Sequence, residues 1–73
     1  MTLQKKPIQE LITQAKILIQ RNSPSQARDL LDTCLAYLAY QTSYIENPLD
    51  SRWLDKTKTK VWNLLEDNNL LLD

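Results

Sequence analysis

The sequence contains no glycine and no histidine, and it contains a single cysteine, Cys34. Glycine usually supplies the backbone freedom for tight hairpin turns and for phosphate-cradling loops, so its absence argues against both. Without histidine, one cysteine cannot assemble the ligand set of a zinc site, and it has no disulfide partner within the chain. We therefore expect no metal, no cofactor and no intrachain disulfide.

An excess of charge of one sign is also lacking, because nine basic and nine acidic residues cancel to a net charge of zero. A neutral domain has no general positive field to gather phosphates, so we expect no nucleic-acid binding by the domain as a whole. No segment approaches the roughly 20 apolar residues of a membrane helix, and residues 1–6 do not resemble a signal peptide. The sequence predicts a cytoplasmic protein with no membrane partner.

The sequence does contain helix-start signals and apolar residues at helical spacing, which predict three helices over residues 7–21, 24–46 and 48–67. Pro7 suits the first turn of the first helix. Ser23 is a predicted cap for the second, with Pro24 in its first turn, and Asn47 is the predicted cap of the third. Apolar residues recur every three or four positions in each segment. They are Ile8, Leu11, Ile12, Ala15, Leu18 and Ile19, then Ala27, Leu30, Leu31, Cys34, Leu35, Leu38 and Ile45, then Trp53, Leu54, Thr57, Val61, Leu64 and Leu65.

Short connections between these segments favour antiparallel neighbours, so the predicted fold is all-α, an up-down-up three-helix arrangement. The domain is expected to span residues 7–69, after a flexible segment at residues 1–6 and before an apolar C-terminal tail at residues 70–73. A chain of 73 residues gains only a few kcal/mol of net stability from its core at this size. Without a disulfide or a metal, docking on a partner or on a second copy is the remaining way to increase the stability of the domain.

From Leu11 to Leu35 the spacing resembles one tetratricopeptide-type helical hairpin. The matching positions are Leu11, Ala15, Leu18, Ala27, Leu31 and Cys34. The sequence departs from the motif at Gln14, where a large apolar residue is usual, and at Ala39, where a closing proline is common. No second repeat follows, although at least three normally form a stable solenoid. The resemblance implies a non-catalytic interaction module.

The residue types that perform catalysis are not arranged for it. Cys34 lies within an apolar stripe, which is typical of a small buried hydrophobe, and no neighbouring cation or exposed helix start favours a thiolate. The paired acids fall on predicted solvent faces or near helix ends: Asp29 with Asp32, Asp50 with Asp55, and Glu66 with Asp67. We predict that the chain is not an enzyme and has no small-molecule substrate.

The aromatic residues indicate a protein interface, since tyrosine and tryptophan bury much area at low entropic cost. Three tyrosines lie at helical spacing on one flank of the second helix, where either the third helix covers them with their hydroxyls reaching water or they form an interface. A tryptophan of the third helix projects away from that helix's apolar face. With the apolar tail, the predicted partner-binding residues are Tyr37, Tyr40, Tyr44, Trp62, Leu70, Leu71 and Leu72. The predicted function is a small adaptor or regulatory domain that associates with itself, as a dimer or larger assembly, or docks on a larger protein.

A second reading rests on a basic stripe of the third helix. Arg52, Lys56 and Lys60 recur every four residues and therefore share one face. The stripe is either a solvated face or an electrostatic docking surface. Because a three-helix DNA-binding fold places such a stripe on its third helix, a nucleic-acid-binding module is the alternative function.

Overall fold

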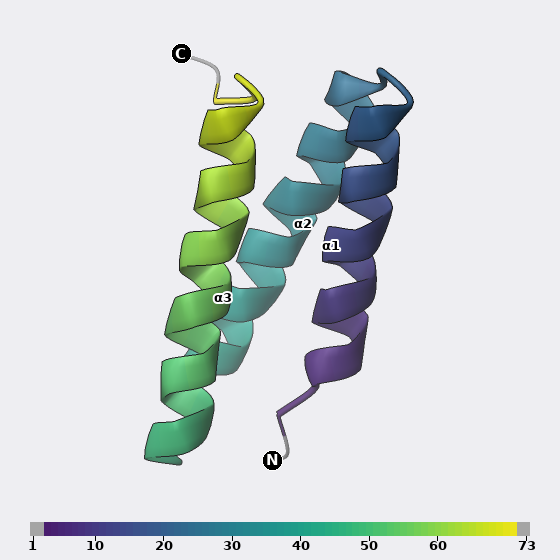
Figure 1. Ribbon diagram of the computed structural model, residues 1–73. Coiled ribbons are helices and arrows are strands. Elements are labelled where there is room, and N and C mark those ends of the chain that lie inside the picture. The colour runs from purple at the N-terminus through teal and green to yellow at the C-terminus, as the bar shows by residue number, and fades with distance from the viewer. Residues whose placement is uncertain (1–2, 72–73) are drawn as a thin grey trace.

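Three α-helices form the fold in the computed structural model, which describes residues 3–71 and has no strand among them. They are α1 (Lys5–Gln20), α2 (Pro24–Thr42) and α3 (Pro48–Asp67). In Figure 1 the chain rises along α1, descends along α2 and rises again along α3, and α2 packs against both other helices. The all-α, up-down-up prediction is confirmed.

The first and third helices lie close to their predicted bounds. Helix α3 covers the predicted residues, whereas α1 begins at Lys5 and ends at Gln20, instead of covering residues 7–21. Pro7 is accepted as the third residue of α1 because N–H groups of the first turn have no helical partner anyway. The predicted flexible segment 1–6 therefore contributes Lys5 and Lys6 to a helix, and its residues 1 and 2 lie outside the described part of the chain.

Helix α2 ends at Thr42, so its predicted extension to Glu46 is wrong. The Ser43 N–H donates to the Tyr40 carbonyl three residues back at 3.2 Å, and the Ser43 hydroxyl donates to the same oxygen at 2.6 Å. A serine side chain that bonds the local backbone competes with helical hydrogen bonding in this way. Ile45 still packs against the core from the loop after the helix, so the apolar spacing continues where the helix does not.

The caps predicted for α2 and α3 differ in the structure. Asn47 accepts a hydrogen bond from the Leu49 N–H at 2.9 Å and has extended backbone before Pro48, so the predicted cap of α3 is confirmed. Ser23 occupies the cap position of α2, but its side chain makes no capping hydrogen bond. The predicted Ser23 cap is wrong in this respect.

Asparagine replaces glycine at two helix ends. Asn22 follows α1 and Asn69 follows α3 with φ of 62° and 56°, the left-handed backbone that glycine usually provides. After Asn69, the Leu70 N–H donates to the Leu65 carbonyl at 2.7 Å, and both leucine side chains are buried. This bonding and apolar contact, a Schellman motif, turns the chain back over the end of α3.

The core runs between the three helices and contains the predicted stripe of Leu31, Cys34 and Leu38 on α2, all fully buried. The buried apolar residues are Ile8, Ile12, Ala15, Ala27, Leu31, Cys34, Leu38, Leu54, Val61, Leu65 and Leu70. Two polar side chains are also buried, those of Gln41 and Thr57. Gln41 was not predicted to be buried.

Candidate protein-binding surfaces

The three tyrosines of α2 and its following turn lie together, and we refer to them as the tyrosine face. Tyr40 is 63% exposed, whereas Tyr37 and Tyr44 are half-buried. The rings of Tyr40 and Tyr44 meet edge to face, with centroids 5.2 Å apart and planes at 73°. Partial burial, followed by the neighbouring phenols of Tyr40 and Tyr37, raises the pKa of Tyr44. The three tyrosines therefore form one aromatic cluster, of which Tyr40 is the exposed member.

A groove adjoins the tyrosine face between α1 and α2. It has a volume of about 770 Å³. Leu11, Pro7 and the Tyr37 ring are its apolar lining, and Gln14 stands among its polar residues. The complete lining is Lys6, Pro7, Gln9, Glu10, Leu11, Thr13, Gln14, Thr33 and Tyr37. The groove therefore adjoins the tyrosine face at Tyr37, which belongs to both.

Trp62 lies in a different place, near the N-terminal half of α2. It is 46% exposed and shares a small hollow of about 170 Å³ with Leu71, which is 47% exposed. Arg28 and Asp32 of α2 line the same hollow, and their side chains form an ion pair with Nε and Oδ2 3.9 Å apart. We refer to Trp62, Leu71, Arg28 and Asp32 as the tryptophan patch.

The apolar tail does not form one exposed unit. Leu70 is only 6% exposed because the turn after α3 packs it into the core, so it is removed from the predicted partner-binding set. Leu71 is exposed beside Trp62. Leu72 lies outside the described residues.

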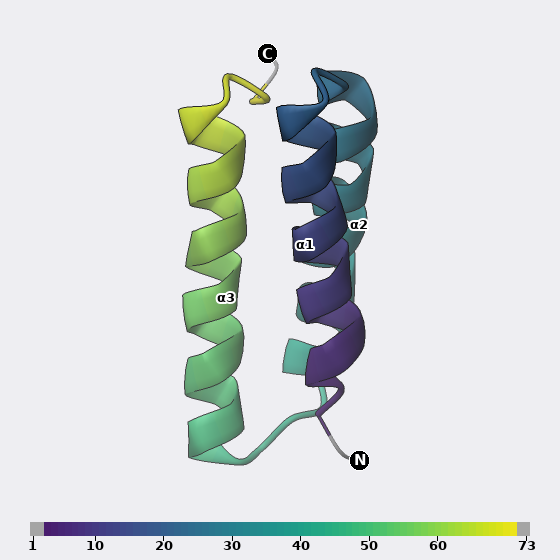
Figure 2. The same ribbon diagram turned by 45° about the vertical axis from the view of Figure 1, so that its right-hand side comes forward.

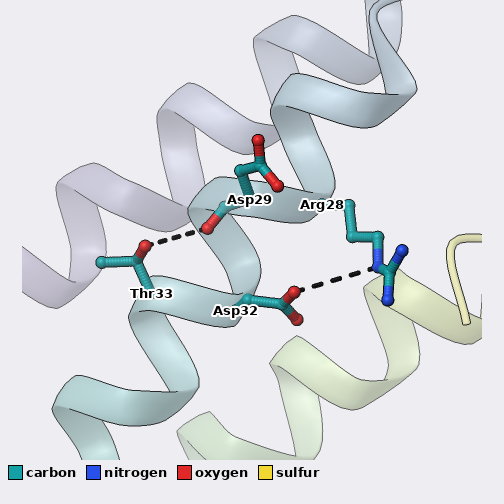
Figure 3. A network of polar contacts seen from close by, with 4 residues as sticks. All are labelled: Arg28, Asp29, Asp32 and Thr33. Atoms are coloured by element: carbon teal, nitrogen blue, oxygen red, sulfur yellow. Dashed lines mark hydrogen bonds and ion pairs between the residues drawn. The ribbon is translucent and has the colours of Figure 1, made fainter.

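The tyrosine face and the tryptophan patch are separate surfaces, although the sequence grouped their residues as one. Tyr37 and Thr33 face the groove shared with α1, whereas Arg28 and Asp32 face Trp62 of α3. Figure 3 shows this division on α2: Thr33 donates to the Asp29 main-chain oxygen at 2.9 Å on one side, and Arg28 reaches Asp32 on the other. From Arg28 to Tyr40, α2 advances about 18 Å at 1.5 Å per residue.

The predicted basic stripe is exposed along α3, at Arg52, Lys56 and Lys60. The structure adds a lysine that the sequence did not single out, because Lys16 of α1 lines a hollow together with Lys56 and Lys60. Its place beside α3 depends on the crossing of two helices, which periodicity within one helix cannot show.

Cys34 is a free, buried thiol, and burial raises its pKa from 9.0 to about 11, which opposes formation of a nucleophilic thiolate. Among residues 3–71 no three Cys, Asp or Glu side chains are grouped closely enough to hold a metal ion. None of the helices described there has the length and apolar character needed to cross a membrane.

Comparisons with protein-family models, with curated proteins and with solved structures found no match to this chain. The resemblance to a tetratricopeptide hairpin is therefore still a prediction from spacing. Its three small positions, Ala15 on α1 and Ala27 and Cys34 on α2, are all fully buried in the described core.

Proposed function

We propose that this chain is a small, non-enzymatic domain that binds another protein through the tyrosine face and the adjoining groove. The observation that carries the proposal is the exposed Tyr40 ring, held edge to face against Tyr44 beside the groove that contains Tyr37. The alternative function, nucleic-acid binding by the basic stripe, has less support because the chain is neutral overall.

The physical basis is preorganisation. An edge-to-face aromatic contact contributes about 0.5–1.5 kcal/mol beyond the area that it buries, so the two rings restrict one another before any partner arrives. A tyrosine already held in place loses less side-chain entropy on binding. Leu11 supplies apolar area in the groove, and Gln14 and Glu10 supply hydrogen-bonding groups along it. An apolar centre with polar edges is the usual composition of a protein interface.

Self-association is the second candidate, and the tryptophan patch favours it. Arg28 and Asp32 place charges of both signs beside Trp62 and Leu71. Across a two-fold axis, the arginine of one copy meets the aspartate of the other while the apolar side chains pack together. The proposal thus assigns a foreign protein to the tyrosine face and a second copy to the tryptophan patch.

The test of the tyrosine face is site-specific photo-cross-linking in cells. Benzoylphenylalanine at position 40 should form discrete adducts with a protein that excess wild-type chain displaces. The same group at position 20 is the matched control, because Gln20 is an exposed residue at the C-terminal end of α1 and does not belong to the tyrosine face or the groove. Equal adduct patterns at the two positions would show that the tyrosine face has no special role.

Light scattering over a dilution series tests the second candidate separately. We expect Trp62→Ala to shift wild-type self-association toward monomer and Tyr40→Ala to leave it unchanged. A wild type that stays monomeric at high concentration would exclude self-association and leave the foreign partner alone.

A further inference from the structure

In Figure 2 the ribbons of α1 and α3 run alongside one another. Residues of both helices line a cationic hollow, away from both surfaces described above. It has a volume of about 340 Å³, and lysine side chains from two helices line it. Its lining residues are Lys16 on α1 and Lys56, Thr59, Lys60, Asn63, Leu64 and Asp67 on α3.

The charge of this hollow contrasts with the charge of the whole chain. Three lysines and one aspartate line it, whereas the complete sequence has a net charge of zero. Between residues 3 and 71 the ion pair that the structure contains is Arg28–Asp32, so no carboxylate there neutralises the three lysines at contact distance. Three lysines against one aspartate leave the hollow with a net positive charge, which attracts an anion.

The arrangement of donors matches an anion with several oxygens. Lys56 and Lys60 are one helical turn apart, which places their Cβ atoms about 6 Å from each other. Lys16 approaches from the other helix, and the Asn63 side chain lies among them with amide N–H groups to offer. Ammonium groups bind phosphoryl oxygens as mobile point charges that adjust to the ligand.

We propose that this hollow binds a soluble oligophosphate, an anion with two or more linked phosphoryl groups. Lysines on both helices favour a ligand that carries negative charge at more than one point. The positive charge of the hollow is local, whereas a duplex-binding face needs an extended positive surface. Duplex DNA presents a long row of phosphates, whereas here Asp67 interrupts the positive surface at one end of the hollow. This inference is independent of the proposed protein-binding function.

The test is an NMR titration of the 15N-labelled full chain with tripolyphosphate at low salt. We expect saturable shifts in the amides of Lys16, Lys60 and Asn63. Each of Lys16→Gln and Lys60→Gln should weaken the affinity about two- to fivefold, as expected for one exposed ion pair. Lys58→Gln is the matched control, because it removes the same charge from α3 at a position that does not line the hollow.

Three results would overturn the inference. Absence of saturable shifts at the hollow would show that the lysines form no site. A loss in Lys58→Gln equal to that in Lys16→Gln would show general attraction to the chain's cations. Tighter binding of a short DNA duplex than of tripolyphosphate, with shifts extending to Arg52, would assign the stripe to nucleic acid instead.

Discussion

The buried side-chain amide of Gln41 hydrogen-bonds both the N–H and the carbonyl group of Gln4. The Gln4 N–H donates to Gln41 Oε1 at 2.9 Å, and Gln41 Nε2 donates to the Gln4 carbonyl at 3.3 Å. One amide at the end of α2 thereby positions the residue that precedes α1, across 37 positions of sequence. This pairing satisfies a fully buried polar side chain and fixes the chain entry into the first helix.

Gln41→Ala should lower the free energy of unfolding by about 1–3 kcal/mol, because both hydrogen bonds are lost in a buried site. Urea unfolding measures the change. Gln9→Ala, which truncates the same side chain at an exposed position of α1, is the control and should change stability by less than about 0.5 kcal/mol. Equal effects of the two substitutions would contradict the role assigned to Gln41.

Leu31→Ala should cost about 2–5 kcal/mol, since Leu31 is fully buried in the predicted core stripe of α2. Leu49→Ala makes the same chemical change at a residue that is 72% exposed and should cost less than about 0.5 kcal/mol. Thermal and urea unfolding of the two variants give the comparison. A loss below about 0.5 kcal/mol for Leu31→Ala would show that the stripe is assigned incorrectly.

Asn47→Ala should destabilise the domain by about 1 kcal/mol, because the Asn47 side chain caps α3 through the Leu49 N–H. Ser23→Ala should have a smaller effect, below about 0.5 kcal/mol, because Ser23 makes no capping hydrogen bond. Differential scanning calorimetry of both variants tests the difference. The sequence alone predicts similar effects for both, so the reverse order would contradict the cap geometry of the structure.

These cap positions show which parts of the fold a sequence can predict. The three helices follow from apolar spacing and from Pro24 and Pro48, which act on neighbouring residues and leave a local signal. The predicted end of α2 at Glu46 is wrong because Ile45 keeps the apolar spacing while it packs from the loop after the helix. Whether a serine at a cap position forms its bond depends on backbone and rotamer geometry, which the residue type does not determine.

The sequence predicts residues of the candidate surfaces, but it does not predict how those residues are grouped in space. Tyr40 and Trp62 are both exposed, but they belong to surfaces separated along α2. Lys16 joined the cationic hollow, and Lys5 lies 5.3 Å from the Trp53 ring centroid in a cation–π contact, through the relative placement of α1 and α3. Periodicity shows which face a residue occupies, and only the packing of helices shows what that face meets.

The buried thiol of Cys34 makes the free energy of unfolding depend on pH. Burial raises the pKa of its thiol from 9.0 to about 11. In the unfolded chain the thiol loses its proton near pH 9, whereas the folded chain keeps it until about pH 11. Between these values the unfolded state binds fewer protons than the folded state, so the free energy of unfolding falls as pH rises. The contribution is fully present below pH 9 and is lost toward pH 11.

Comparison with Cys34→Ala isolates this effect, because every other titratable group is common to both proteins. Cys34→Ala should be less stable than the wild type at pH 7, since it leaves a small cavity in the core. That difference should narrow between pH 9 and pH 11, where only the wild type loses the thiol contribution. Urea midpoints measured across this range give the two curves. Parallel curves would mean that the thiol ionises equally well in the folded and unfolded chains, and would contradict the raised pKa of the buried thiol.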